Sequence, residues 1–535
     1  MTPAQKKVLY VLIGLGALVL LALIPANAAG AKDANMLALF EVDEYAQYPH
    51  VLRMLTPGDT PYQTLRNFVI YLHYFYGYPF YLFSALALLP VKLGLGSGWQ
   101  DATRVIVTVL REMVSVLPML LSAGLLVWMQ TRFKPGWLAV GLYILLLSVP
   151  GVVVNHLWWH PDSLSFLLVT LTLFFLDRDR LSFGRNFVLA GLICGAAVGM
   201  KFQGLFFVLA VPLLLIWGLA VRRIRAGRAV LLAGMFVGLM AAGLVLTNPL
   251  LLLPQERAEI IRTQQTLFRE INTGQILVNS ASFFENGRFP ADVRVHYGEP
   301  LFLLLALAGL TLGLFHPDRR HLNALILAWI LPAGWAVLNA ATRRTHYYFP
   351  ILLPLISCLV NLAPAYLPPA VSTWGKSRPA KAILGLLTLG LLVQWGAFIR
   401  TDAGILRTQL ARETSSAPIQ FYQQIQQQVL PDLPPGPLTA YRDWRIYFPA
   451  APGRQVEMNW KMASYPYIEA LDPDLILLER ENVELYARPE VVEQAVNPGN
   501  MQLTHAFYRD AARNTLTGYR LIFESDYGLV FGRQP

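Results

Sequence analysis

The hydrophobic pattern of the chain consists of long apolar runs separated by short polar turns. Eleven runs approach the length of about 20 residues that a membrane-spanning helix needs. They lie at 8–29, 107–129, 136–156, 163–177, 187–200, 203–221, 229–248, 299–315, 322–341, 346–366 and 380–399. The first is longer than a signal-peptide core, so we expect it to be a retained helix. The pattern predicts an α-helical polytopic membrane protein with about eleven transmembrane helices.

Basic residues fall in alternate loops between these runs. The clusters include Lys6 and Lys7 and lie further along at 132–134, 178–185, 222–228, 319–320 and 376–381. The positive-inside rule puts all of them on the cytoplasmic side, which requires an even number of crossings between clusters. Counting the aromatic-rich stretch 74–93 as a crossing would break that rule. We therefore predict an interfacial, juxtamembrane helix there, on the outer face.

Three large segments then share the extracytoplasmic side: loop 30–106, loop 249–298 and the polar tail that follows residue 400. We predict a transmembrane domain over 1–400, which includes both loops, and a small extracytoplasmic α/β domain over 401–535. Three short, mostly apolar segments predict strands, namely Leu475–Leu478, Tyr519–Phe523 and Gly528–Phe531, and the last two form a predicted hairpin around Ser525–Tyr527.

Composition narrows the class of protein further. Of 535 residues, 55% are apolar and only 14% are charged, which excludes an ordinary soluble enzyme and a disordered chain. The net charge of +10 is accounted for by the basic loops, so it does not indicate nucleic-acid binding. Cys194 and Cys358 both lie in apolar runs and form no disulfide framework.

In the first half of the chain, where acidic residues are scarce, two places on the outer side carry candidate carboxylates. Glu41, Asp43 and Glu44 follow the first helix closely, and Asp162 ends the turn His160-Pro161-Asp162. A carboxylate at the membrane surface can remove a hydroxyl proton or bind a divalent cation. The alternatives are a solvated loop for the first group and, for Asp162, a cap on the following helix.

Cations occur on the outer side against the positive-inside bias. Lys201 stands alone in an apolar hairpin, and Arg343 and Arg344 precede His346 and Tyr347. A snorkelling lysine would explain the first, whereas two arginines in a short outer loop call for an anion such as a lipid phosphate. Together with the carboxylates, these side chains suit group transfer from a lipid phosphate to a hydroxyl.

At these residues the chain resembles the GT-C superfamily of polytopic glycosyltransferases, in its protein O-mannosyltransferase and lipid A aminoarabinose transferase branch. The segments that carry the resemblance over about 400 residues are Asp43-Glu44, Tyr76–Pro79, His160–Asp162, Gly191–Gly204 and Arg344–Pro350. The resemblance implies inverting transfer of a sugar from a polyprenyl-phosphate donor on the outer face of the membrane. The compact chain, in which no loop needs glycosylation sequons to explain it, favours a bacterial inner membrane. The resemblance makes Asp43 the general base, positioned with Glu44, and implies a substrate-binding set of His160, Asp162, Lys201, Arg343, Arg344, His346 and Tyr347.

The acceptor stays open between a glycan, a lipid and a protein. Where a protein mannosyltransferase would have His-Pro-Pro-Leu, this chain has Gly77-Tyr78-Pro79-Phe80, which puts a protein acceptor in doubt. Relatives differ in metal use, so a divalent metal is a possible cofactor with unknown ligands. The alternatives to an enzyme are a transporter of lipid-linked glycans and a non-catalytic polysaccharide-assembly subunit. Ionisable residues at outer helix ends, with no internal repeat, favour the enzyme.

Overall fold

The computed structural model describes residues 1–278, 291–340, 344–367, 378–460 and 462–534. The chain divides into two compact units. The first comprises Met1–Asn27, Pro49–Gln265 and Ala281–Arg407, and the second comprises Ala28–Tyr48, Thr266–Ser280 and Thr408–Pro535. The segment with Asp43 and Glu44 thus belongs to the same unit as the C-terminal residues, whereas the sequence predicted it within a domain over 1–400.

The first unit is helical. Its elements are α1 (Pro3–Ala28), α4 (Pro61–Val69), α5 (Tyr78–Leu95), η1 (Gly96–Asp101), α6 (Thr103–Leu110), the π-helical turn η2 (Arg111–Val116), α7 (Leu117–Thr131), α8 (Gly136–Leu147), α9 (Pro150–His156), α10 (Asp162–Asp179), α11 (Arg185–Met200), η3 (Phe202–Phe206), α12 (Phe207–Ala220), α13 (Ala226–Thr247), η4 (Pro249–Leu252), α14 (Pro254–Thr273), α16 (Ala291–Tyr297), α17 (Pro300–Phe315), α18 (Arg320–Asn339), η5 (Thr345–Tyr347), α19 (Phe349–Ser357), η6 (Cys358–Leu362), η7 (Pro364–Tyr366) and α21 (Arg378–Ser415). Each of the eleven predicted apolar runs falls on one or more of these helices. The protein is an integral membrane protein.

The number of crossings stays a prediction. Among the described residues, six helical stretches are long and apolar enough to span a membrane: Pro3–Ala28, Tyr78–Asp101, Thr103–Thr131, Phe202–Ala220, Ala226–Thr247 and Arg320–Asn339. A seventh is formed if α8 and α9, bent by 64°, act as one span, and three apolar helices are shorter. The stretch Tyr78–Asp101 meets the length criterion although the sequence predicted an interfacial helix over 74–93, so that placement is untested too.

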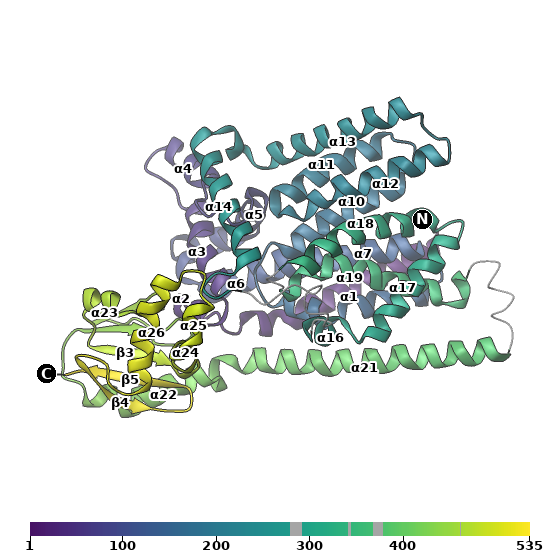
Figure 1. Ribbon diagram of the computed structural model, residues 1–535. Helices are drawn as coiled ribbons and strands as arrows, with labels where there is room; N and C mark the ends of the chain where they lie inside the picture. The colour runs from purple at the N-terminus through teal and green to yellow at the C-terminus, as the bar shows by residue number, and fades with distance from the viewer. Residues whose placement is uncertain (279–290, 341–343, 368–377, 461, 535) are drawn as a thin grey trace. The chain divides into compact units, whose positions relative to one another are not determined.

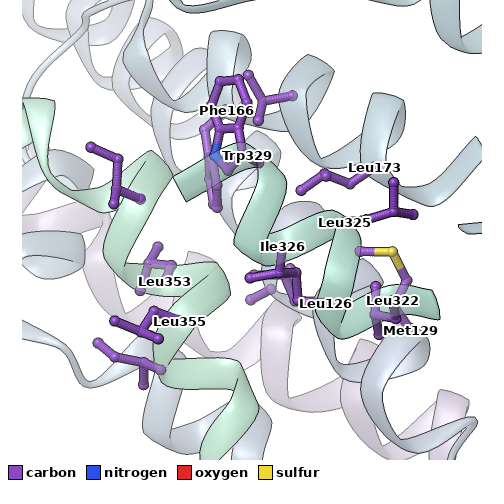
Figure 2. Packing of buried hydrophobic residues seen from close by; sticks show 14 of the residues in the cluster. Leu126, Met129, Phe166, Leu173, Leu322, Leu325, Ile326, Trp329, Leu353 and Leu355 are labelled. Carbon is purple, nitrogen blue, oxygen red and sulfur yellow. The ribbon is translucent and has the colours of Figure 1, made fainter. Parts of the chain in front are cut away.

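An apolar core of large side chains packs α7, α10, α18 and α19 together (Figure 2). Trp329 of α18 is almost fully buried, stacks on Phe207 with ring centroids 4.5 Å apart, and donates its indole N–H to the Pro350 carbonyl at 2.8 Å. Phe166 of α10 packs edge-to-face on Phe349, the first residue of α19. The hydrogen bond to the indole N–H removes the penalty of burying that group in an apolar core. The contact between Phe166 and Phe349 holds α10 against the segment that follows η5.

Close packing of α11 on α13 depends on glycine (Figure 1). A Cβ at Gly195 would lie 2.1 Å from the Met240 carbonyl oxygen, and one at Gly243 would lie 2.1 Å from the Leu192 carbonyl oxygen. Only residues without a side chain allow two helix backbones to approach so closely. The glycines of α11 and α13 thus fix the position of the helix that ends just before Lys201.

The second unit is an α/β domain built on a five-stranded sheet. Its elements are α2 (Ala34–Phe40), the start of α3 (Val42–Leu55), α22 (Ala417–Gln428), η9 (Leu430–Asp432), β1 (Leu438–Arg442), β2 (Arg454–Met458), α23 (Tyr465–Leu471), β3 (Leu475–Glu479), α24 (Arg480–Tyr486), α25 (Glu490–Glu493), α26 (Pro498–Ala512), β4 (Tyr519–Glu524) and β5 (Gly528–Arg533). The strand order is β2-β1-β3-β5-β4. β2, β1 and β3 are parallel, while β5 is antiparallel to β3 and to β4. The predicted strand β3 and the β4–β5 hairpin are confirmed; the sequence did not indicate β1 and β2.

Candidate functional site

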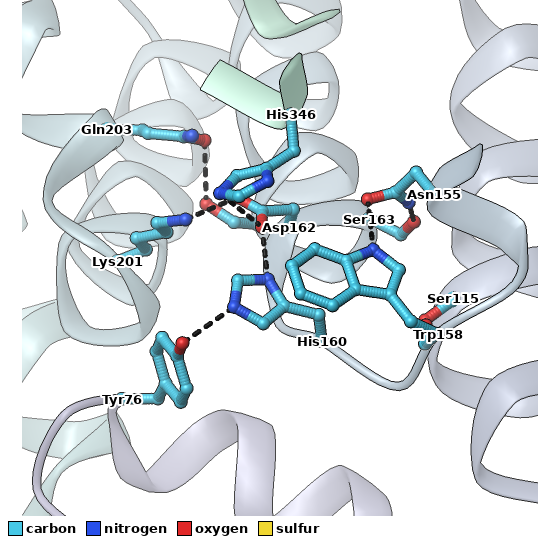
Figure 3. Close-up of polar contacts among 11 residues, drawn as sticks. Tyr76, Ser115, Asn155, Trp158, His160, Asp162, Ser163, Lys201, Gln203 and His346 are labelled. Carbon is cyan, nitrogen blue, oxygen red and sulfur yellow. Dashed lines mark hydrogen bonds and ion pairs between the residues drawn. The ribbon is translucent and has the colours of Figure 1, made fainter. Parts of the chain in front are cut away.

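The candidate site is centred on Asp162, the first residue of α10, whose side chain is fully buried (Figure 3). One carboxylate oxygen lies 2.6 Å from the Lys201 ammonium. The other contacts Nδ1 of His160 and lies 3.8 Å from Nε2 of His346. We call these four residues the Asp162 cluster. Asp162 makes no side-chain cap on α10, so its carboxylate serves the cluster.

Three segments of the chain contribute the residues of the Asp162 cluster. His160 and Asp162 flank Pro161 in the turn between α9 and α10, and His346 lies in η5. Lys201 follows α11 in an extended conformation, because the helix stops at Met200. These segments are far apart in sequence, yet each predicted side chain reaches the same carboxylate.

Gly77 locks the Tyr76–Pro79 segment against the backbone that leads to Lys201. Its N–H donates to the Met200 carbonyl at 3.2 Å, and a Cβ there would lie 1.5 Å from the Gly199 carbonyl oxygen. The next residue, Tyr78, donates its N–H to the Asn248 side-chain oxygen at 2.9 Å. Any other residue at Gly77 would push the two segments apart.

Aromatic rings line the cluster. Trp158 stacks on His160 with ring centroids 4.0 Å apart and planes 4° apart, and the Tyr76 hydroxyl lies 2.6 Å from Nε2 of His160. The Lys201 ammonium lies 5.0 Å from the centroid of the Tyr347 ring, a cation–π distance. Lys201 and His346 keep 20% and 16% of their side chains exposed, whereas His160 and Asp162 are buried. The cluster is therefore reached from the side of Lys201 and His346.

A shell of neutral hydrogen bonds holds the Trp158 side of the site. The indole N–H of Trp158 donates to Asn155 at 3.4 Å, and Asn155 donates to Ser163. Ser115, from the π-helical turn η2, donates to the Trp158 carbonyl at 2.5 Å. A π-helical turn inside a helix often marks a functional position, and here it fixes the ring on which His160 stacks.

A second pair of histidines adjoins Tyr76. The rings of His50 and His73 lie 5.1 Å apart, and Nδ1 of His73 lies 2.5 Å from the Tyr81 hydroxyl. Burial and, to a smaller extent, the neighbouring His50 lower the pKa of His73 to about 4. Burial also lowers the pKa of His50. Both imidazoles are therefore neutral at pH 7 and add no charge to the site.

The Asp162 cluster permits a divalent metal ion. Nitrogen atoms of His160 and His346 and a carboxylate oxygen of Asp162 all lie within 4.8 Å of one another. Two imidazoles and a carboxylate form a donor set typical of zinc and similar ions. The sequence left the ligands unknown, because His346 lies 184 residues beyond Asp162 and nothing in the spacing joins them.

The other predicted site residues are Asp43, Glu44, Arg343 and Arg344. Asp43 is half-buried and Glu44 fully buried in the first turn of α3, in the second unit. Arg344 is exposed immediately before η5, and Arg343 lies outside the described residues. The predicted site list omitted Tyr76 and Trp158, although Tyr76 begins the segment singled out by the resemblance.

No protein-family model and no curated protein matches the chain. Solved structures do match. ArnT from Cupriavidus metallidurans bound to undecaprenyl phosphate superposes with a TM-score of 0.51 at 13% identity, covering 97% of each chain, and its apo state gives 0.50 at the same identity and coverage. The oligosaccharyltransferase of Archaeoglobus fulgidus in its apo form gives 0.47 at 13% identity, covering 92% of this chain and 72% of that one.

The match to ArnT extends over both units. This chain has the GT-C fold. At 13% identity the likeness concerns architecture, and it confirms the predicted combination of a polytopic helical domain with a small C-terminal α/β domain.

Proposed function

We propose that this GT-C protein is a membrane glycosyltransferase, which moves a sugar from a polyprenyl-phosphate donor to a hydroxyl of a glycan, lipid or protein acceptor. The observation that carries the proposal is the Asp162 cluster, in which a lysine and two histidines meet at one buried carboxylate beside aromatic rings. The shared fold supports it, because ArnT was solved with undecaprenyl phosphate bound. We place the protein in a bacterial inner membrane, with the site on the outer face.

The proposed reaction is a single displacement with inversion. Asp43 accepts the proton of the acceptor hydroxyl while that oxygen bonds to the anomeric carbon of the sugar. The bond from that carbon to the phosphate oxygen breaks, and the electron pair leaves with the polyprenyl phosphate. Glu44 positions Asp43 or the acceptor in this scheme.

The phosphate is the part of the donor that the Asp162 cluster suits. A lysine ammonium has three donors, and the contact with Asp162 uses one of the three on Lys201. The remaining donors can meet a phosphate, with Arg343, Arg344 and His346 adding further contacts. Asp162 holds Lys201 in place for this role, and His160 and Tyr347 flank the bound group.

A divalent ion is a proposed cofactor, held by His160, Asp162 and His346. When bound, it would supply further positive charge to stabilise a phosphate leaving group. Metal analysis of the purified protein tests this: we expect about one equivalent of a divalent ion in wild type and a clear loss in His346→Ala. Equal metal content in both would remove the ion from the proposal.

The test of function is mass spectrometry of the purified protein incubated with a panel of polyprenyl-phosphate sugars. We expect release of free polyprenyl phosphate from one donor class, lowered about 10²–10⁴-fold in Asp43→Asn because a general base is lost. Asp318→Asn, at an exposed carboxylate between α17 and α18, is the matched control and should act as wild type. Donor binding without turnover in any condition would favour a transporter or an assembly subunit.

A further inference from the structure

The acidic segment is built into the second unit by specific contacts. Arg412 pairs with Glu41 at 3.0 Å and donates two hydrogen bonds to the Ala29 carbonyl, at 3.1 and 2.7 Å. Gly30 must be a glycine here, because it has a φ of +71° and a Cβ would lie 2.0 Å from the Arg412 guanidinium. The Tyr447 hydroxyl donates to Asp33 at 3.0 Å, and Asp33 caps α2. The residues before Asp43 are thus part of this domain.

These contacts place the start of α3 at one particular edge of the sheet. Tyr447 lies in the loop that follows β1, and Trp460 lies in the loop that follows β2. The Trp460 ring lies 6.2 Å from the ring of Tyr45, two residues after Asp43. β1, β2 and β3 are parallel, so these loops share the carboxyl edge of the sheet, which is where open α/β sheets bind their ligands.

Packing in the hydrophobic core does not account for the presence of a tryptophan at position 460. Trp460 is 43% exposed and, among the described residues, belongs to neither hydrophobic cluster that covers the two faces of the sheet. Glu457, near the end of β2, places a carboxylate on this edge. Glu44 is buried. A carboxylate repels nucleic acids and anionic lipid headgroups but accepts hydrogen bonds from hydroxyl groups. An exposed aromatic face on an edge with a carboxylate therefore suits a polyhydroxylated, uncharged ligand.

We propose that the carboxyl edge of this sheet, with Trp460 and Tyr45 as its aromatic face, binds a carbohydrate acceptor. The inference rests on the proposed function, and it narrows the acceptor to a glycan. Residues two apart on a helix project about 200° apart, so Asp43 and Tyr45 leave opposite sides of the first turn of α3. An acceptor that rests on Trp460 must extend around a helix about 10 Å wide to reach Asp43. A single sugar is too short for both contacts, so the acceptor is an oligosaccharide.

The test is binding of the full-length protein, in nanodiscs, to a glycan array that carries monosaccharides and oligosaccharides. We expect wild type to bind oligosaccharides in preference to monosaccharides, and Trp460→Ala to lower the affinity at least tenfold. Trp460→Phe should keep most of the binding because it keeps an aromatic face. Leu503→Ala, at an exposed apolar residue of α26, is the matched control and should bind as wild type.

Two outcomes would overturn the inference: no glycan bound by wild type, or equal binding by wild type and Trp460→Ala. Binding of monosaccharides as tight as that of oligosaccharides would overturn the length requirement. Because this readout needs no turnover, it is independent of the donor assay. Release of polyprenyl phosphate without glycan binding would keep the proposed function and reject this acceptor.

Discussion

Two fully buried aspartates show how differently this chain can use the same side chain. Asp162, in the first unit, meets a lysine and two histidines. Asp443, in the loop after β1 of the second unit, accepts hydrogen bonds from the hydroxyls of Tyr508 and Tyr441, at 2.6 and 3.2 Å, and from the amide of Asn482 and the backbone N–H of Glu479, at 3.2 and 3.0 Å.

The difference in partners separates a ligand site from a structural hub. Burial raises the pKa of Asp443, and its neutral donors offset only part of that increase. Asp443 is enclosed, and its four bonds connect β1, β3, α24 and α26. Asp162 instead lies beside the partly exposed Lys201 ammonium and the partly exposed imidazole of His346, and the ammonium can exchange one anionic partner for another. We therefore propose a chemical role for Asp162 and a structural role for Asp443.

Removing the charge at Asp162 gives the largest expected effect. In Asp162→Asn the Lys201 ammonium loses its counter-ion, and removing one charged partner of a buried pair is costly. We expect release of polyprenyl phosphate to fall at least about 100-fold, a magnitude typical of a lost electrostatic contribution to catalysis. The donor assay measures this. Activity close to wild type in a folded Asp162→Asn protein would make Asp162 a second structural aspartate and end the contrast.

Lys201→Met tests whether the cluster binds phosphate. The substitution keeps the length of the side chain and removes its charge, so donor affinity should fall about 10-fold or more, as expected for a lost charge-assisted hydrogen bond. Lys201→Arg, which keeps the charge, should lose less. Titration of the donor into the nanodisc-embedded protein measures both. Unchanged affinity in Lys201→Met would restrict Lys201 to neutralising Asp162.

The sequence predicted the Asp162 cluster better than it predicted the site as a whole. The sequence singles out ionisable or aromatic residues that interrupt an apolar pattern at predicted outer helix ends, namely His160, Asp162, Lys201, His346 and Tyr347. The convergence of His160, Lys201 and His346 on the Asp162 carboxylate depends on helix packing, and so does the metal-permitting geometry. Trp158 has the ordinary sequence signature of an interfacial tryptophan, so its stack on His160 could only be found from the structure.

In the fold, too, local sequence patterns predicted some features, and others could be found only from the structure. Long apolar runs predicted the helices, and short, mostly apolar segments predicted β3 and the final hairpin. β1 and β2 were missed because Leu438–Arg442 and Arg454–Met458 mix polar and apolar residues and contain no such apolar segment. The association of 28–48 with the C-terminal residues depends on Gly30, Arg412 and Tyr447. Arg412 and Tyr447 both lie hundreds of positions after Gly30 in the sequence. No local pattern contains that information.

Asp443→Asn should affect stability and leave chemistry alone. The asparagine amide would point N–H groups at the existing donors, so we expect a loss of about 1–3 kcal/mol in the free energy of unfolding. Thermal unfolding in detergent measures the loss. Release of polyprenyl phosphate per folded molecule should match wild type. A specific loss of turnover without loss of stability would move Asp443 from the structural to the chemical side of the comparison.

Glu479, which ends β3 beside Asp443, gives the smallest expected effect and a pH signature. Burial raises its pKa to about 7, although Arg445 opposes the shift. A carboxyl group with a raised pKa binds its proton more tightly in the folded state, so stability falls as pH rises from the unfolded value of 4.5 towards 7. The loss is at most about 3 kcal/mol for a shift of this size.

Glu479→Gln removes the titration but also weakens the contact with Arg445, so we expect a gain of about 1 kcal/mol in the free energy of unfolding at pH 8 and little change at pH 5. Thermal unfolding at the two pH values measures it, with Glu481→Gln, at an exposed neighbour, as the control. The same gain in stability at both pH values would show that the ionisation of Glu479 does not destabilise the fold.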